Sequence, residues 1–184
     1  MPETRTGLLV EIEPFDPACH QRQGFSCGSA RVDNYLKRTA KKHSRRDFVR
    51  LFVAVRPGEK TVLGYYALNA HALDASALPE PFLRQAPRHG RIPAAYLSVI
   101  GVDKACQRQG LGQVLLVDAL KRVLALSEDI GLTAVVLDVL EEGGGALVAR
   151  RRHFYERMGF TPLPSRPGRM FLTIRDIRAA FDQA

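Results

Sequence analysis

The sequence predicts an α/β fold, of the α+β kind, in which about four helices flank a mixed central β-sheet of six to seven strands. Strand-like and helix-like segments follow in the order strand, helix, three strands, helix, strand, helix and two strands. The run at 133–140 is almost continuously apolar, as expected of a strand that is covered on both faces. With 184 residues, 46% hydrophobic and 25% charged, the chain fits a single domain spanning residues 1–184.

In the first half of the chain we expect a helix between two strand regions. Apolar residues recur at helical spacing after Ser29, which is suited to cap the helix. A turn at 56–60 separates two segments rich in β-branched and aromatic residues, which indicates a hairpin. The predicted elements are a strand at 8–13, a helix at 30–43, a strand at 48–55 and its partner strand at 62–71.

In the second half, four prolines between residues 74 and 93 indicate a loop with at most a short helix. The predicted elements that follow are a strand at 94–102, a helix at 112–127, a strand at 133–140, a helix at 146–158 and strands at 160–163 and 170–174. Gly159 is expected to end the helix before it. One side of the helix at 112–127 carries five apolar residues, namely Val114, Leu115, Ala119, Val123 and Leu126.

The net charge of +8 is concentrated in two places. The segment 37–50 alone has a net charge of +6, because only Asp47 opposes its basic residues, which are Lys37, Arg38, Lys41, Lys42, Arg45, Arg46 and Arg50. A second basic group comprises Arg150, Arg151 and Arg152. Such runs can be solvated helix faces, but two of them in one basic protein favour an acidic partner, such as a nucleotide cofactor, RNA or an acidic protein.

The cysteines and the chain start suggest where the protein works. Cys19, Cys27 and Cys106 show no Cys-x-x-Cys spacing, so we expect free thiols in a reducing compartment. No signal-like apolar run follows Met1, and no stretch approaches the roughly 18 apolar residues that span a membrane. We therefore expect a soluble cytoplasmic protein. No spacing of His, Cys or Asp suggests a metal site, and none suggests a Ser–His–Asp triad.

The stretch QRQGLG at 107–112 lies between a predicted strand and a predicted helix. A helix start presents backbone N–H groups without intrahelical acceptors, and its dipole favours anions. Gly110 and Gly112 would let the backbone approach a ligand closely. Neither a G-x-G-x-x-G fingerprint nor a Walker loop is present. Taken alone, the stretch fits either a phosphate site or an ordinary strand–helix turn.

Two motifs together resemble the GNAT acetyltransferase superfamily. The pattern Q/R-x-x-G-x-G/A at 107–112 is similar to that family's pyrophosphate loop, and HFYERMGF at 153–160 is similar to its later helix. The resemblance covers residues 95–175. It extends to the GNAT toxins of bacterial toxin–antitoxin pairs through GFSCG at 24–28, VDNYL at 32–36 and GYYAL at 64–68. The chain departs from these toxins in a longer glycine-rich segment at 141–149 and in a strand without arginine at 97–103.

The resemblance implies a GNAT fold and a mechanism. Acetyl-CoA would lie between strands 95–102 and 133–140, bound by Ile100, Val102, Gln107, Arg108, Gln109, Gly110, Leu111 and Gly112. Tyr155 matches the general acid that protonates the departing thiolate, although beside Phe154 and Met158 it could also be a core residue. Asn69 and His71 lie where an acceptor amine could enter, and His71 is a candidate general base.

The resemblance also implies partners. The acceptor would be the α-amine of aminoacyl-tRNA, whose phosphates could contact Lys37, Lys41, Lys42, Arg45, Arg46, Arg150 and Arg151. A ribbon-helix-helix antitoxin and a homodimer are expected, and a membrane is not. Two other functions remain open, namely acetylation of a small-molecule or protein amine, and a non-catalytic regulator that binds acetyl-CoA or RNA.

Overall fold

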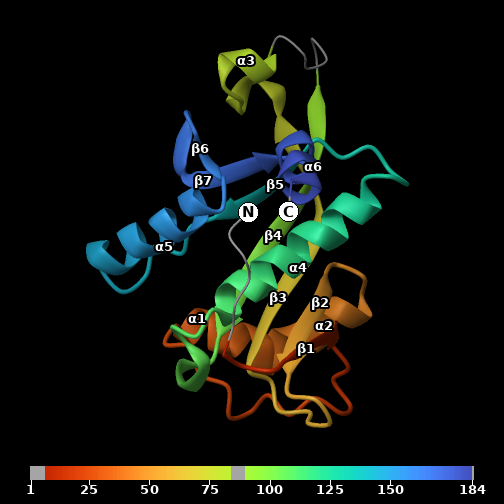
Figure 1. Cartoon of the computed structure of the whole chain (residues 1–184), viewed down its shortest axis with the longest axis vertical. Coiled ribbons are helices and arrows are strands. Elements are labelled where there is room, and N and C mark those ends of the chain that lie inside the picture. Colours follow the sequence, from red (N-terminus) through yellow and green to blue (C-terminus); the bar gives the residue numbers. More distant parts are fainter. Residues whose placement is uncertain (1–6, 84–89, 184) are drawn as a thin grey trace. The chain divides into compact units, whose positions relative to one another are not determined.

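The computed structural model describes residues 7–83 and 90–183, which form two compact units. Unit 1 holds residues 70–96 and 122 onward, and unit 2 holds residues up to 69 and 97–121. Seven strands lie in the order β1-β2-β3-β4-β5-β7-β6, and β3 and β4 each contribute to both units (Figure 1). The predicted mixed sheet of six to seven strands with flanking helices is confirmed.

The strands are β1 (Glu11–Pro14), β2 (Arg50–Val55), β3 (Gly64–Asp74), β4 (Arg91–Val102), β5 (Ala134–Asp138), β6 (Thr161–Leu163) and β7 (Arg166–Thr173). The α-helices are α1 (Ala30–Asn34), α2 (Ala40–Arg45), α3 (Glu80–Leu83), α4 (Leu111–Leu126), α5 (Gly145–Arg157) and α6 (Ile174–Asp182). A π-helical turn, η1 (Tyr35–Thr39), joins α1 to α2, and 3-10 turns η2 (Ala75–Ala77) and η3 (Lys104–Cys106) follow β3 and β4.

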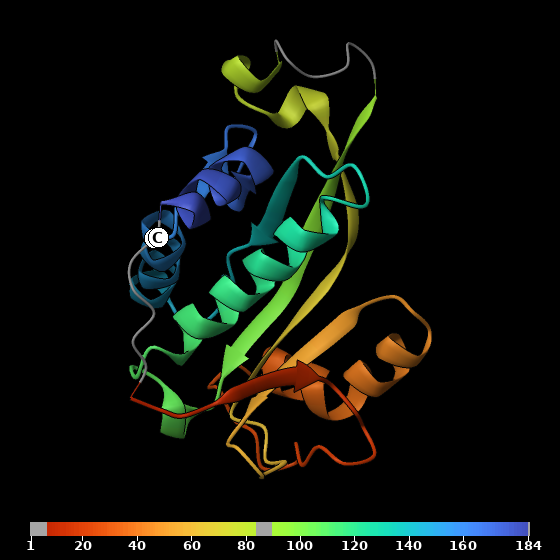
Figure 2. The ribbon, with the colours of Figure 1, turned by 45° about the vertical axis from the view of Figure 1, so that its right-hand side comes forward.

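Unit 2 is built on the predicted hairpin. β2 and β3 pair antiparallel with Leu51 opposite Ala67, and β1 pairs antiparallel with β2. The helical run 30–45 lies beside β2 (Figure 2). The Ser29 side chain accepts the Val32 N–H at 3.3 Å, so the predicted cap is confirmed. The predicted helix differs in one respect, because the π-turn η1 interrupts it between α1 and α2.

Two glycines allow close packing in unit 2. A Cβ at Gly64 of β3 would lie 2.8 Å from Leu115 Cδ1 of α4. A Cβ at Gly101 of β4 would lie 2.8 Å from Val32 Cγ1 of α1. Both distances are too short for real carbon contacts, so only glycine lets the two helices approach these strands.

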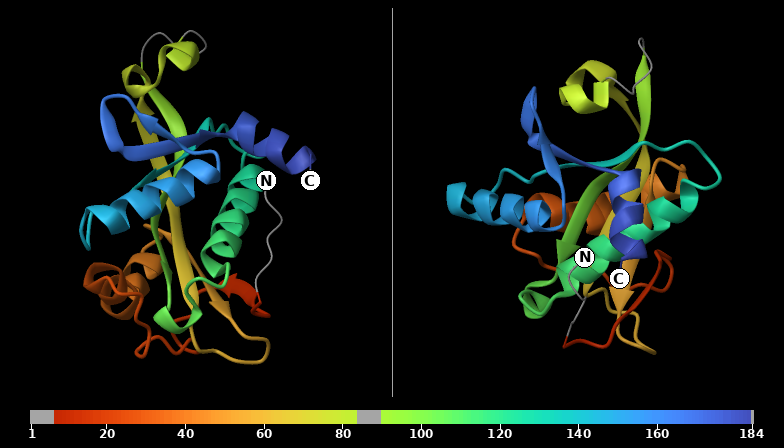
Figure 3. Two further views of the ribbon diagram at one scale, coloured as in Figure 1. Left: turned by 60° about the vertical axis from the view of Figure 1, so that its left-hand side comes forward. Right: turned by 45° about the horizontal axis from the view of Figure 1, so that its top comes forward.

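Unit 1 is centred on β5, which is buried over Ala134–Leu137 as the apolar sequence predicts. β5 pairs antiparallel with β7, and β7 with β6. One face of this sheet carries an apolar cluster made of Leu73, Leu78, Ile92, Ala94, Ala134, Val136, Leu163 and Phe171. Gly159, with φ of +92°, ends α5 as predicted, and α6 continues from the end of β7 (Figure 3).

Several predictions differ from the structure. The predicted strand at 170–174 begins earlier, at Arg166, and α6 was not predicted at all. β4 begins at Arg91 and includes Pro93, which has no N–H to donate but whose carbonyl accepts the Thr133 N–H at 2.9 Å. Leu126 is the last residue of α4 and is 47% exposed, whereas Val123, one turn earlier, is buried as predicted. Pro87 of the predicted loop at 74–93 lies outside the described residues. Residues 1–6, on which the interpretation of the chain start rests, also lie outside them.

Candidate active site

The loop that precedes α4 has an unusual backbone. Arg108 has φ of +60° and Gly110 has φ of +84°, so two residues in three adopt the left-handed region. Among the described residues, the N–H groups of 108–112 have no hydrogen-bond acceptor. Successive residues that alternate between right- and left-handed backbone conformations direct their N–H groups to one side, and so does the start of a helix. Both arrangements form anion sites. The loop is therefore suited to hold a phosphate or pyrophosphate.

This loop is fixed by contacts with the GFSCG motif at 24–28. Gln107 Nε2 donates to the carbonyls of Cys27 at 2.8 Å and Val102 at 3.0 Å. Asp103 accepts the Ser26 N–H at 2.9 Å, and the Lys104 N–H donates to the Ser26 carbonyl at 2.8 Å. Two motifs that lie some 80 residues apart in sequence thus form one structure.

The predicted donor-site residues therefore divide by role. The Gln107 side chain holds the loop in shape, and its N–H faces the Lys104 carbonyl at 3.4 Å. Arg108 and Gln109 are exposed. Ile100 and Val102 are half-buried on β4. Gly110, Leu111 and Gly112 supply free N–H groups at the start of α4.

Tyr155 is 8% exposed and lies near the end of α5 in unit 1. Its ring contacts Phe154 and Phe160 edge-on, at centroid distances of 5.2 and 6.0 Å. Burial raises the pKa of Tyr155 to about 12, an effect that the charge of Arg151 partly opposes. The hydroxyl therefore keeps its proton at neutral pH, as a general acid requires.

Unit 1 also contains a polar network that the sequence analysis did not find. Arg169 of β7 forms a two-bond ion pair with Asp138 of β5, and Tyr96 of β4 donates to the same carboxylate at 2.8 Å. The Arg169 guanidinium lies 5.5 Å from the centre of the Tyr96 ring. His71 of β3 completes the network, with its ring 5.2 Å from that of Tyr96 and its Nε2 3.3 Å from Arg169 Nη1.

The network decides the chemistry of His71. Burial, followed by the charge of Arg169, lowers the pKa of His71, so the ring is neutral at pH 7. Since Arg169 can only donate, Nε2 must be the acceptor and the proton must lie on Nδ1. His71 was a candidate general base, but this arrangement leaves Nε2 occupied and Nδ1 as a donor. Asn69 lies on the part of β3 that belongs to unit 2.

The two basic groups lie in different units. In segment 37–50 of unit 2, Lys37 is half-buried, and the exposed members are Arg38, Lys41, Lys42, Arg45, Arg46 and Arg50. In unit 1, Arg150 is exposed, whereas Arg151 Nη1 donates to the carbonyls of Leu140 and Glu142. Arg151 thus fixes the segment after β5 against α5, a role that its sequence position did not reveal.

Within residues 7–83 and 90–183, no group of His, Cys, Asp and Glu could hold a metal ion. No described helix is long and apolar enough to cross a membrane. The three cysteines are free, and burial raises the pKa of Cys27 to about 11 and also raises that of Cys106. None of the three thiols is therefore activated as a nucleophile.

The chain matches the family described as acetyltransferase (GNAT) domain over residues 47–162. It is 46% identical to a Sinorhizobium fredii protein named "Probable toxin TacT", over 91% of this chain and 93% of the other. It is 32% identical to the "tRNA-acetylating toxin" of Mycobacterium tuberculosis, over 84% of this chain and 87% of the other. The solved structure of AtaT complexed with acetyl-methionyl-tRNAfMet is similar at a TM-score of 0.83 and 26% identity, over 94% of this chain and 99% of that one.

Proposed function

Because the chain belongs to the GNAT acetyltransferase family, we propose that it transfers the acetyl group of acetyl-CoA to the α-amine of an aminoacyl-tRNA. The observation that carries the donor half is the row of free N–H groups at 108–112, which suits the pyrophosphate of coenzyme A. The acceptor half rests on similarity to the tRNA-acetylating toxin and on the basic segment 37–50.

On the donor side, backbone N–H groups from Arg108 to Gly112 bind the pyrophosphate, and the Arg108 side chain adds positive charge. Gln107 shapes this loop through its bonds to Cys27 and Val102. The backbone near Ile100 and Val102 pairs with the pantetheine arm. Acetyl-CoA supplies a thioester, which an amine can attack directly without a covalent enzyme intermediate.

Tyr155 acts as the general acid that donates its proton to the departing sulfur. A thiol has a pKa of about 8.5 in water, but burial raises the pKa of a thiolate just as it raises that of Tyr155. A buried thiolate therefore accepts a proton more readily than the same group does in water. The attacking α-amine has a pKa of about 8 in its free form, so a fraction of it is neutral at pH 7 without a dedicated base.

On the acceptor side, the exposed cations contact tRNA phosphates. The proposed contacts are Lys37, Lys41, Lys42, Arg45 and Arg46, with Arg150 as the available member of the second basic group and Arg151 contributing charge only. The proposal further includes a single domain over residues 1–184, a cytoplasmic location, a homodimer and a ribbon-helix-helix antitoxin that restrains the toxin.

The test is acetyl transfer from labelled acetyl-CoA with the purified chain and a set of charged tRNAs. Label should enter aminoacyl-tRNA, and mild alkali should release it as an N-acetyl amino acid. Deacylated tRNA and free amino acids should stay unlabelled. Transfer to a small amine or a protein in preference to aminoacyl-tRNA would contradict the proposed acceptor, and binding of acetyl-CoA without any transfer would indicate a regulator.

A further inference from the structure

Phe48 is an exposed aromatic residue that neither the fold nor the donor site accounts for. It is 61% exposed at the turn between α2 and β2, near the end of the basic segment 37–50. A single exposed apolar residue is ordinary on a protein surface. Three features, all within unit 2, distinguish Phe48 from such a residue.

The first feature is the turn that presents Phe48. Asp47 adopts a φ of +60°, and the N–H groups of Asp47 and Phe48 donate to the carbonyls of Ser44 at 3.2 Å and His43 at 3.1 Å. This is the Schellman pattern, in which glycine is the usual left-handed residue. Here Asp47 takes the place of that glycine, and its carboxylate accepts a hydrogen bond from Arg50 Nη1 at 2.7 Å. The chain after α2 is therefore held in one defined conformation that directs Phe48 outward.

The second feature is a series of aromatic contacts that leads from the core to Phe48. The fully buried Tyr65 ring lies parallel to that of Tyr35, with centroids 6.5 Å apart. Tyr35 contacts His43 edge-on at 5.7 Å, and His43 contacts Phe48 in the same way at 5.9 Å. The Phe48 ring is thus anchored at one side while most of its surface remains open to solvent.

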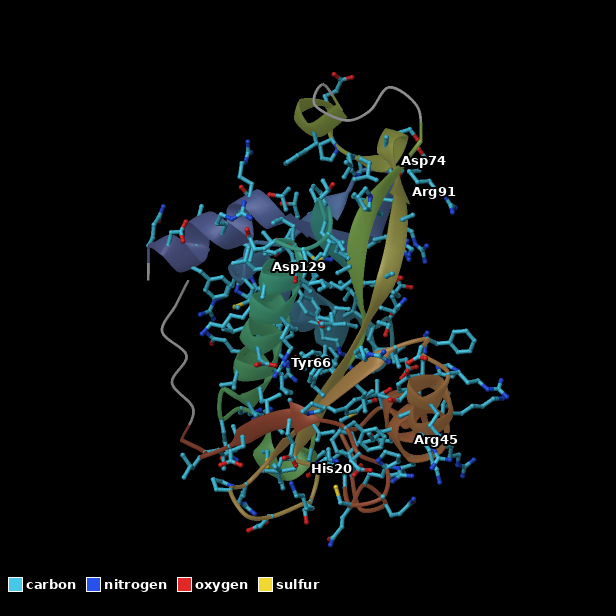
Figure 4. The ribbon with its side chains drawn as sticks, turned by 90° about the vertical axis from the view of Figure 1, so that its right-hand side faces the viewer. His20, Arg45, Tyr66, Asp74, Arg91 and Asp129 are labelled. Atoms are coloured by element: carbon cyan, nitrogen blue, oxygen red, sulfur yellow. The ribbon has the colours of Figure 1, made fainter. Side chains whose placement is uncertain are left out.

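The third feature is the charge around the ring. Arg45 and Arg46 precede Phe48, Arg50 follows it, and all three are exposed. Arg45 lies on the solvent side of α2 (Figure 4). An open aromatic ring among cations is the arrangement that binds unpaired nucleotides, because phosphates pair with the cations and a base stacks on the ring. An acidic peptide would pair with the same cations, but carboxylates offer no flat apolar partner for the ring.

We propose that Phe48 is a stacking platform for an unpaired RNA base, with Arg45 and Arg46 binding the neighbouring phosphates. The identity of the RNA as tRNA rests on the proposed function. The stacking itself does not, because it needs only a single-stranded nucleotide.

The chain contains no tryptophan, so Phe48→Trp introduces a single fluorescent reporter at the proposed platform. A short single-stranded RNA should quench its emission, and the same strand annealed to its complement should not. Quenching by the duplex to the same extent, or by an acidic peptide alone, would overturn the proposal.

Binding by variants of the full chain supplies the second measurement. Phe48→Leu keeps an apolar contact for His43 but removes the aromatic ring, and it should weaken binding of single-stranded RNA roughly 5- to 100-fold. Phe48→Tyr should bind as the parent does, and duplex binding should be unchanged in both variants. Arg45→Gln should reduce the salt dependence of binding, which Phe48→Leu should leave unaltered. Equal losses for single-stranded and duplex RNA in Phe48→Leu would contradict the proposal.

These outcomes are independent of acetyl transfer. If aminoacyl-tRNA is acetylated and Phe48→Leu binds single-stranded RNA like the parent, the platform is wrong and the function stands. If no aminoacyl-tRNA is acetylated and binding still depends on Phe48, the function is wrong and the platform stands.

Discussion

Asp138 and Arg169 face each other across β5 and β7 and are joined by two parallel hydrogen bonds, Nε to Oδ1 at 2.8 Å and Nη2 to Oδ2 at 2.7 Å. Side chains alternate along strands, so Asp138 lies on the same face as Ala134 and Val136, and Arg169 on the same face as Phe171. Those three residues belong to the apolar cluster of unit 1. The ion pair therefore lies where this cluster ends, and its two parallel hydrogen bonds are charge-assisted, which makes them stronger than bonds between neutral groups.

The carboxyl group of Asp138 should make stability depend on pH. Its bonds to Arg169 hold its pKa below the ordinary value. Because the folded-state pKa is lowered, the stabilisation is present above the unfolded pKa of about 3.9 and is lost as pH falls through the folded value. Asp138→Asn should therefore lower the melting temperature at pH 7 and flatten its acid dependence below pH 4.

Thermal unfolding across pH checks this, with Glu128→Gln as the matched control. Glu128 pairs with Arg178 at 2.6 Å, but both side chains are about half exposed or more. The control should change stability by less than about 1 kcal/mol. An unchanged acid limb in Asp138→Asn would show that other carboxylates govern it.

Replacing Arg169 should change the titration of His71. Arg169 lowers the pKa of His71 through its charge, whereas Asp138 raises it. Arg169→Met removes the positive charge that lowers the pKa of His71 and leaves the Asp138 carboxylate, which raises it. The pKa of His71 should therefore rise. Histidine ring signals followed by NMR across pH measure this directly. Arg178→Gln is the control, and a pKa of His71 that falls in Arg169→Met would show that the charge of Arg169 does not lower it.

Tyr155→Phe tests the proposed general acid. The ring and its contacts with Phe154 and Phe160 are preserved, so the fold should be unaffected. We expect kcat for acetyl transfer to fall roughly 10²- to 10⁴-fold, with the acetyl-CoA affinity nearly unchanged. Steady-state kinetics and equilibrium binding separate the two quantities. Near-normal kcat in Tyr155→Phe would assign the tyrosine to the core alone.

Gly112→Ala tests the anion site without disturbing the fold. Gly112 has an ordinary negative φ, and an added Cβ would meet only Val102 Cγ2 at 3.8 Å. Alanine should stabilise α4 by up to about 1 kcal/mol, and the pattern Q/R-x-x-G-x-G/A allows alanine at this position. We expect unchanged acetyl-CoA binding by calorimetry together with an equal or higher melting temperature, and weaker binding would show that a methyl group at this position reaches the ligand. Gly131→Ala, at an open position with nothing within 4 Å, is the control and should leave binding unchanged.

Gln107→Glu tests the connection between the two motifs. The amide donates to two carbonyls, and a carboxylate in its place would repel both. Loop 107–112 should lose its shape, so both the melting temperature and the acetyl-CoA affinity should fall. Gln109→Glu is matched in chemistry, but its exposed side chain makes a single bond to the Ala105 carbonyl. If the two variants behave alike, Gln107 does not organise the loop.

Periodicity predicted those elements whose burial pattern is strong. β5, the β2–β3 hairpin and α4 follow from apolar runs and spacing. α6 escaped prediction although Thr173 caps it by accepting the Asp176 N–H at 3.1 Å, because its first residue, Ile174, was assigned to the preceding strand. A Thr-x-x-Asp pattern at 173–176 was the available signal.

The sequence by itself determined the family and the backbone shape of loop 107–112, because a loop of six consecutive residues carries its geometry in local residue types, above all glycine at Gly110, where φ is positive. The tertiary structure decided which residues that are far apart in sequence come into contact. It placed Gln107 against Cys27, and it brought His71, Tyr96, Asp138 and Arg169 together from four strands. Each of those four residues alone is an ordinary strand residue. Because the strands pair, His71 lies beside Arg169 and keeps its proton on Nδ1. The same pairing brings Arg169 to Asp138, which holds the pKa of that carboxyl below its ordinary value.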